Sequence, residues 1–192
     1  WTVGDSVSVG YDGVTYISDK RVEADMILGI SEEYLKYTFK ENKARVNDFA
    51  LGFDGWFKMN ENSYDMDITY ETQESTFKSL LSLVPGMYTQ DFGSIQTEGQ
   101  VSFKGMVKGI FSDTQMPAFN LAVLVNDAMF KYPDLPTAVT NINIDLLVDN
   151  KDGIIDNTVV DLRKMHLDFG SNPVDARLLI ENLKNYKMDG SV

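Results

Sequence analysis

Acidic side chains are the first residues in this sequence whose types and spacing could do chemistry. Asp65 and Asp67 stand at alternate positions, so in a strand they share one face, and Asp54 could lie beside them. Two carboxylates that flank a glycosidic bond are the catalytic groups of most glycosidases. However, the chain carries 29 acidic residues, and pairs at this spacing arise by chance in so acidic a sequence. We therefore interpret these aspartates as part of a solvated face.

A metal site or an activated nucleophile has little support. His166 is the only histidine, and it alternates with Met165 and Leu167, which predicts a position on the polar face of a strand. The sequence contains no cysteine, and therefore no thiolate, disulfide or cysteine-ligated metal. It also lacks a Gly-x-Ser-x-Gly elbow, a phosphate loop and a Gly-x-Gly-x-x-Gly fingerprint. We expect no enzymatic activity, no metal and no cofactor.

The string DNKDG at 149–153 has a superficial likeness to a calcium loop. Such a loop places oxygen ligands at alternate positions before its glycine. Counting back from Gly153 puts those positions at Asp152, Asn150 and Val148, and no glutamate closes the loop. A turn between two strands fits the string better.

The charge balance narrows the possible partners. The chain has 192 residues, of which 43% are hydrophobic, and its net charge is -12. Such a charge argues against nucleic acid, because phosphate contacts need clustered Lys and Arg, and against electrostatic docking on an anionic membrane. No apolar run reaches the ~20 residues of a transmembrane helix. Because the chain opens with Trp1 and shows no signal peptide, we expect residues 1–192 to be a single segment of a longer protein.

The elements that must position these residues are mostly strands. Apolar and polar residues alternate through Phe49–Phe57, Tyr64–Tyr70 and several later stretches, which indicates half-buried strands. The alternation slips by one residue between Leu162 and Met165, which predicts a β-bulge near Arg163-Lys164. We expect roughly ten strands joined mostly by short turns, hence an all-β, mostly antiparallel fold.

Turn signals and one helix complete the prediction. Asp-Gly pairs at 12–13 and 152–153 favour tight turns, whereas the pair at 54–55 stands inside an apolar run and indicates a bulge or bend. Residues 59–63 and 170–173 are expected to be polar loops. Residues 31–37 are ambiguous between helix and strand, and we favour a strand from about Tyr34. The stripe Phe77, Leu80, Leu81 and Val84 predicts one helix, with Ser75 as its N-cap and Pro85-Gly86 as its stop.

The segment 116–150 consists of two alternating arms on either side of Phe130–Pro136. Two prolines three residues apart keep that string extended, and we interpret it as a rigid corner between two strands.

The apolar faces of the strands allow two interpretations. They could meet a second sheet and form a closed sandwich, or stay partly open and line a groove. A carbohydrate-binding surface is a third possibility, for which Trp1, Trp56 and Tyr64 are the obvious residues. The residues that would line a groove are Phe49, Leu51, Phe53, Phe57, Met66, Ile68, Tyr70, Val101, Phe103, Leu121, Val123, Val125, Ile142, Ile144 and Leu146.

Several strings resemble the AsmA-like proteins of the Bacteroidetes. The resemblance covers roughly Tyr37 to Ile180 and is carried by YTFKENKARVNDFALGFDGWFKM, TFKSLLSLVPGMYTQDFGSIQTEGQVSFKGMVKG, MPAFNLAVLVNDAMFKYPDLPTAVTNINIDLLV and DNTVVDLRKMHLDFGSNPVDARLLI. Its most specific parts are the Pro-Ala-Phe-Asn-Leu segment, Phe-Lys-Tyr-Pro-Asp-Leu-Pro and Gly-Ser-Asn-Pro-Val-Asp.

The resemblance implies a fold and a function. AsmA-like proteins are large envelope proteins of Gram-negative bacteria, anchored in the inner membrane by one N-terminal helix. Their periplasmic part is a long twisted β-sheet curved into a half-pipe, whose apolar concave face is thought to carry phospholipid acyl chains towards the outer membrane. The expected partners are thus phospholipid or another acyl-chain lipid and other envelope proteins, and no catalytic residues are implied. The alternative is a structural or interaction module of the envelope, a β-sandwich that binds no lipid.

Overall fold

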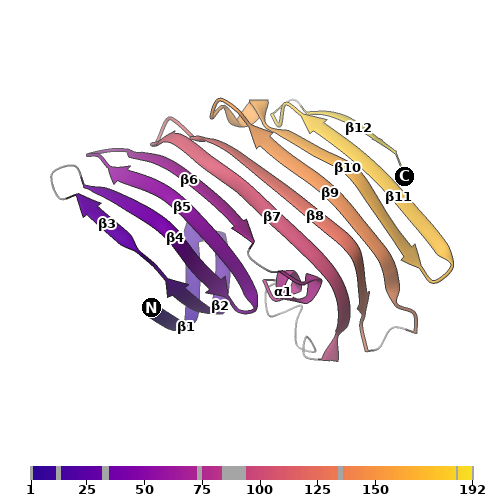
Figure 1. The fold of residues 1–192 in the computed structure, drawn as a ribbon. Helices are drawn as coiled ribbons and strands as arrows, with labels where there is room; N and C mark the ends of the chain where they lie inside the picture. Colours follow the sequence, from indigo (N-terminus) through magenta and orange to yellow (C-terminus); the bar gives the residue numbers. More distant parts are fainter. Residues whose placement is uncertain are drawn as a thin grey trace.

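The computed structural model describes residues 2–11, 14–31, 35–72, 75–83, 94–133, 136–184 and 186–191, without the side chains of 9–11 and 14–18. These residues form one long, open antiparallel sheet of twelve strands with one short helix against it (Figure 1). The strands are β1 (Thr2–Tyr11), β2 (Val14–Asp25), β3 (Leu28–Ser31), β4 (Lys36–Val46), β5 (Phe49–Met59), β6 (Tyr64–Thr72), β7 (Gln96–Phe111), β8 (Ala118–Lys131), β9 (Val139–Asn150), β10 (Val159–Phe169), β11 (Asn172–Glu181) and β12 (Lys187–Ser191). The helix α1 spans Phe77–Leu81, and a 3-10 turn, η3, spans Ile155–Asn157.

Sequential hairpins build the sheet from β4 onwards. Each strand from β4 to β12 lies beside the next one in sequence, because the connections are mostly too short for anything but antiparallel neighbours. Asn47 and Gly170 adopt positive φ angles of 53° and 63° in the β4–β5 and β10–β11 turns, as tight turns require. The prediction of an all-β chain with a long antiparallel sheet is confirmed.

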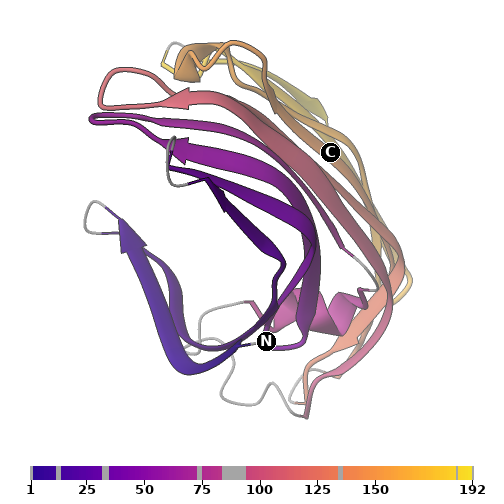
Figure 2. The same cartoon turned by 60° about the vertical axis from the view of Figure 1, so that its left-hand side comes forward.

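The first hairpin leaves the sheet. β2 pairs with the last residues of β4 through Val22–Asp25 only, whereas β3 pairs with the first residues of β4. The rest of β2 therefore continues with β1 as a separate two-stranded ribbon. Figure 2 shows this ribbon curving round to oppose the concave side of the sheet.

The strands are long and bend along their length, so the sheet has the shape of a half-pipe (Figure 2). β-bulges, which bend a strand and increase its twist, interrupt the register at several points. One bulge lies in β4 between Phe39 and Asn42, and another in β10 between Leu162 and Met165, where the alternation of the sequence slips. The bulge predicted near Arg163-Lys164 is thus confirmed.

The chain exposes more surface than a closed domain of its mass. Its accessible area is 12484 Å², whereas a compact 21.6 kDa protein exposes about 9,200 Å². No second sheet covers the curved face within the described residues, so the expectation of a closed sandwich is wrong. The core is accordingly small: Phe77 of α1 with Val101, Val125, Ala128, Val139 and Ile142 of β7–β9.

Some sequence-based details need correction. The N-cap of α1 is Thr76, whose hydroxyl accepts the Ser79 amide proton at 3.2 Å; Ser75 instead accepts the Val101 amide proton at 2.9 Å through its carbonyl. The expected N-cap at Ser75 is wrong because that residue is tied to β7 and cannot face the helix. Twelve strands replace the expected ten, since the first 31 residues supply three.

The turn predictions have mixed outcomes. The Asp-Gly pair at 54–55 lies within β5, where Gly55 has a φ of 127°, so it is a local distortion rather than a turn. Residues 60–63 and 151–158 connect neighbouring strands. Met59 belongs to β5, and Asn172 and Pro173 belong to β11, rather than to the predicted loops. The two arms of 116–150 pair as β8 and β9 across the proline-bearing corner. The pair at 12–13, Glu32–Tyr34, Val84–Gly86, Asp134-Leu135 and Trp1 lie outside the described residues.

Candidate functional site

The predicted groove residues lie on one face of the sheet, which we call the inner face; the opposite side is the outer face. Residues directly opposite each other in antiparallel strands point to the same side. The register pairs Phe103 with Val123, Val123 with Leu146, Leu146 with Leu162, and Leu162 with Leu178. The same register and alternation place on this face Phe49, Leu51, Phe53, Phe57, Met66, Ile68, Tyr70, Val101, Leu121, Val125, Ile142 and Ile144.

The inner face is the concave side of the half-pipe. Figure 2 shows α1 lying inside the curve of the sheet. Because Phe77 of α1 packs on Val101, Val125 and Ile142, the face that carries these residues points into the hollow. We call this hollow, lined by the inner face, the trough.

The trough is sealed only in part. Phe49, Val101, Val125 and Ile142 are buried, with exposed fractions of 5% or less. The other predicted groove residues are half-buried; among them, Val123 and Ile144 pack against the cluster under α1. Water-accessible apolar surface therefore continues along the trough beyond the helix.

The inner face carries no charge in the seven strands from β5 to β11, all of which the structure describes in full. Every inner position there holds an apolar residue, an aromatic residue, glycine or an uncharged polar residue such as Thr72 and Asn150. An unpaired charge in such a place would cost several kcal/mol when covered by an apolar ligand. The inner face is thus uncharged and mostly apolar.

Aromatic rings concentrate at the β4–β7 side of the trough. Tyr37 stacks on Phe57 with 4.8 Å between ring centroids, and Phe39 contacts Phe57 at 5.8 Å and Phe53 at 5.4 Å. A second group joins Phe49, Phe103 and Tyr70, at 5.8 Å and 5.6 Å from ring to ring. Aliphatic residues predominate from β8 to β11, where Phe119, Phe130 and Phe169 are the aromatic residues of the inner face.

The apolar rows run across the strands and so along the trough. One row crosses from β5 to β11 through Leu51, Thr72, Phe103, Val123, Leu146, Leu162 and Leu178, with Thr72 as its polar member. Six spacings between adjacent strands make this row about 29 Å long. The hydrocarbon core of a bilayer, which is two acyl layers, is ~30 Å thick. The row is therefore long enough for an extended acyl chain.

Part of the inner face was not predicted from the sequence. Leu162, Met165, Leu167 and Leu178 extend it over β10 and β11 but were not among the predicted groove residues. Their alternation was visible once the bulge was allowed for. Tyr37 and Phe39 of β4 were also missed, because the acidic stretch before them made the segment ambiguous between helix and strand.

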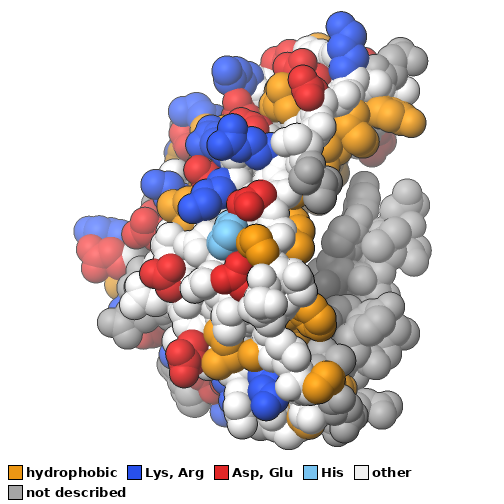
Figure 3. All heavy atoms as spheres, turned by 90° about the vertical axis from the view of Figure 1, so that its right-hand side faces the viewer, with side chains coloured by type: hydrophobic (Ala, Val, Ile, Leu, Met, Phe, Trp, Pro, Cys, Tyr) orange, Lys and Arg blue, Asp and Glu red, His pale blue; other side chains and the backbone are white. Residues whose placement is uncertain are grey.

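The outer face holds the charges and the residues that could have suggested chemistry. Asp65 and Asp67 lie there opposite Lys58 and Trp56, and the Asp67 carboxylate pairs with the Lys108 ammonium at 2.8 Å. Asp54 shares this face and accepts a hydrogen bond from the Glu41 amide. Figure 3 shows Lys, Arg, Asp and Glu gathered on the outer side of the last strands, with hydrophobic side chains towards the trough.

His166 also lies on the outer face. Its Nδ1 is 2.8 Å from the Asp175 carboxylate, and its Nε2 is 3.6 Å from that of Asp168. No cluster of three or more His, Asp or Glu side chains in the described part of the chain could hold a metal ion. The string at 149–153 forms the start of the β9–β10 connection, where the buried Asn150 amide donates to the Ile154 carbonyl at 2.7 Å.

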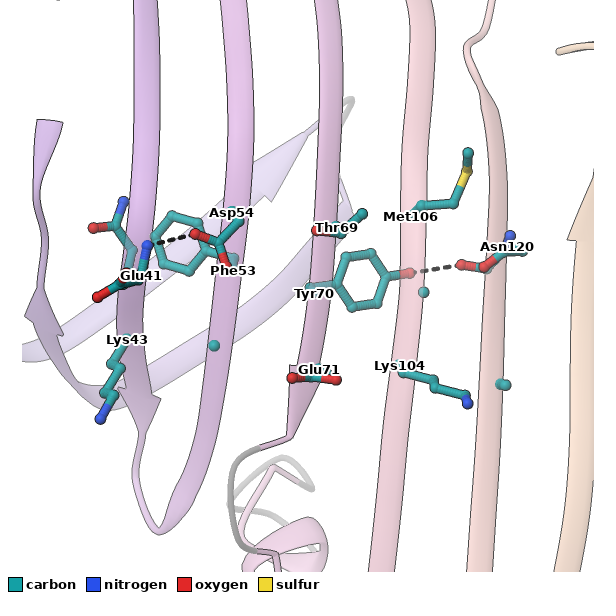
Figure 4. Close-up of a pocket in the computed structure, with 14 residues that line it drawn as sticks. Glu41, Lys43, Phe53, Asp54, Thr69, Tyr70, Glu71, Lys104, Met106 and Asn120 are labelled. Atoms are coloured by element: carbon teal, nitrogen blue, oxygen red, sulfur yellow. Dashed lines mark hydrogen bonds between the residues drawn. The ribbon is translucent and has the colours of Figure 1, made fainter. Parts of the chain in front are cut away.

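A shallow depression of about 680 Å³ lies on the outer face between β4 and β8 (Figure 4). Most of its lining residues occupy outer positions: the register places Lys43, Gly52, Glu71, Lys104 and Ala122 in one row across it. Because its charged side chains are exposed, it is a solvated hollow and does not belong to the trough.

Tyr70 spans a gap in the inner face. Its hydroxyl donates to the Asn120 carbonyl of β8 at 2.9 Å, and its ring passes over Gly105 of β7, where any side chain would collide with it (Figure 4). Burial raises the pKa of the Tyr70 hydroxyl, so the neutral form that donates this bond is favoured. The residue ties three strands together.

Comparisons with known proteins find no match for this chain among family models, curated proteins or solved structures. None of the helices in the described residues has the length and apolar character needed to cross a membrane. A function for the trough must therefore be argued from its geometry and chemistry.

Proposed function

We propose that this chain is a non-enzymatic, lipid-binding segment of a larger envelope protein, and that its trough holds the acyl chains of phospholipids. The observation that carries the proposal is an inner face that is half-exposed and uncharged across seven strands. Apolar surface left open on this scale in a soluble protein marks a binding site.

The chemistry of the trough suits a ligand that makes no hydrogen bonds. An acyl chain leaves a bilayer at little cost only if its new surroundings are equally apolar, since burial contributes roughly 25 cal/mol per Å² in either place. A charged or strongly polar wall would raise the energy of the chain, and the inner face has neither. Transfer in both directions is therefore energetically accessible.

The shape of the trough disfavours a protein partner. A flat sheet or a second copy of this concave face would leave a void between the two surfaces, and voids forfeit dispersion contacts. A flexible chain can follow the curve. The row of about 29 Å that crosses six strand spacings accommodates such a chain along its axis.

The setting we propose is the periplasm of a Gram-negative bacterium, within a protein anchored in the inner membrane that works with other envelope proteins in outer-membrane biogenesis. The resemblance to AsmA-like proteins supports this setting. Fractionation of the native host, with an antibody raised against this segment, tests it: a cytoplasmic protein of about this size would contradict it.

Lipid capture tests the binding proposal. The purified chain is incubated with vesicles of phosphatidylethanolamine and phosphatidylglycerol and separated from them, and bound phospholipid is counted by native mass spectrometry. We expect phospholipid on the wild type and a loss of most of it in Leu121→Asn, which puts an amide on the inner face outside the core cluster.

Leu124→Asn is the matched control. Leu124 lies on the same strand, points to the outer face and is 38% exposed, so the same Leu-to-Asn change there should leave lipid binding intact. Thermal unfolding of both variants separates lost binding from lost structure. A wild type that carries no phospholipid, or two folded variants that bind equally, would refute the proposal.

A further inference from the structure

The helix α1 occupies part of the trough. Phe77 is 8% exposed and packs on Val101, Val125, Val139 and Ile142, with Leu80 and Leu81 beside it. These contacts make the only extended dry cluster in the described chain. Beyond it, the same inner-face rows continue with half-exposed residues along β6 and along β10–β11. The helix therefore lies where a ligand would otherwise lie.

Hydrogen bonds hold both ends of the helix in that place. At its start, the Ser75 carbonyl accepts the Val101 amide proton at 2.9 Å. At its end, the Ser82 carbonyl accepts the Asn47 side-chain amide at 2.8 Å and the Lys20 ammonium at 3.3 Å. The last carbonyls of a helix have no partner within the helix, so both donors satisfy a group that needs one.

Lys20 is the unusual member of this arrangement. It is 7% exposed, although a lysine is almost never fully buried without a partner. Its strand, β2, belongs to the ribbon, and its neighbour Arg21 accepts the Asn47 amide proton through its carbonyl, so the bond of Lys20 to α1 joins the base of the ribbon to the helix. A helix that served only to fill the small core would not need this connection.

We propose that α1 takes the place of an acyl chain over β7–β9, and that Phe77 sets how many chains the trough can hold. This inference rests on the proposed lipid-binding function. The helix narrows the trough where it packs and leaves the rows beyond it open. Removing the Phe77 ring frees apolar space that is continuous with the open rows, and a further chain then enters it.

Counting bound single-chain lipid tests the inference. The probe is palmitoyl-lysophosphatidylcholine, which brings one acyl chain per molecule, held below its micelle concentration and counted by native mass spectrometry at saturation. We expect Phe77→Ala to bind one more molecule per chain than the wild type. Leu124→Ala is the control: Leu124 lies on the outer face, is 38% exposed and does not belong to the core under α1, so the count should not change.

A second variant covers the case in which Phe77→Ala does not fold. Lys20→Met keeps the apolar stem and removes one of the two donors to the Ser82 carbonyl, which loosens the end of the helix, and it should also raise the count. Equal counts in the wild type and in every folded variant of Phe77 or Lys20 would overturn the role of α1 while leaving lipid binding standing. A wild type and variants that all bind no lipid would refute the proposed function, and the inference with it.

Discussion

Replacing Tyr70 by phenylalanine isolates one hydrogen bond in the inner face. The Tyr70 hydroxyl reaches across Gly105 of β7 to the Asn120 carbonyl of β8, at 2.9 Å. Phenylalanine keeps the ring over the glycine and its contact with Phe103 at 5.6 Å between centroids. Only the bond between β6 and β8 is removed, so packing changes should be small.

The stability that Tyr70→Phe should lose at neutral pH follows from the free energy that one such hydrogen bond contributes. A neutral hydrogen bond in a folded protein contributes about 0.5–1.5 kcal/mol net, and a partly buried carbonyl left without its donor moves the cost towards the upper end. We expect Tyr70→Phe to lower the free energy of unfolding by about 1 kcal/mol at pH 7.

The pH dependence supplies an independent check. Burial raises the pKa of the Tyr70 hydroxyl above that of an unfolded tyrosine. The folded state thus holds this proton more tightly, so its stabilising contribution is fully present below the unfolded pKa, near 10, and is lost as the pH rises through the folded pKa. The wild type should therefore lose stability faster than Tyr70→Phe above about pH 10, and the difference between them should shrink.

Urea unfolding followed by circular dichroism at pH 7, 9 and 10.5 measures both effects. Tyr64→Phe is the control, because Tyr64 stands on the same strand and face but is 42% exposed. That variant should match the wild type within about 0.5 kcal/mol at pH 7. A pH-independent difference between the wild type and Tyr70→Phe, or no difference at pH 7, would refute the reasoning.

Three further outcomes can be checked by unfolding experiments. Gly55→Ala should cost at least ~2 kcal/mol, because the added Cβ would meet a β6 carbonyl at 2.0 Å with φ at 127°, whereas Gly29→Ala, with 3.6 Å to its nearest atom, should be tolerated. Asn150→Ala removes three side-chain hydrogen bonds of a residue that is 1% exposed, and should cost about 2–3 kcal/mol. Hydrogen bonds from the Asn157 side-chain amide and, to a lesser extent, from a backbone amide lower the pKa of Asp152. The carboxylate therefore orders the β9–β10 connection at neutral pH, and this order is lost in acid. An NMR titration that gives Asp152 a pKa above that of an unfolded aspartate would contradict this.

Alternation in the sequence was enough to predict the strands and the residues that share a face. Each residue two positions along a strand returns to the same side, so Leu121, Val123 and Val125 had to point together. The slip between Leu162 and Met165 located a bulge for the same reason. These features are local, which is why the sequence alone reveals them.

Whether the apolar face would be covered could not be predicted from periodicity. A strand with one apolar side is equally suited to a closed sandwich and to an open trough, because both need the same residues. Whether the sheet stays open depends on long-range features such as the bulge in β4. This bulge separates the part of β4 that pairs with β2 from the part that pairs with β3, and it releases the β1–β2 ribbon. The N-cap at Thr76 rather than Ser75 likewise depends on a bond to β7, far away in sequence.

Folding alone does not account for the uncharged inner face. The dry cluster under α1 needs the apolar residues of β7–β9, and the aromatic groups on β4–β7 stabilise their own strands. The inner positions of β10 and β11 are half-exposed and could carry polar residues at little cost to stability, as the outer face does. They carry Leu162, Met165 and Leu178 instead, none of which belongs to the cluster under α1, and exposed apolar surface brings a risk of aggregation. A surface that is apolar without being needed for the core is most simply explained by a ligand that covers it.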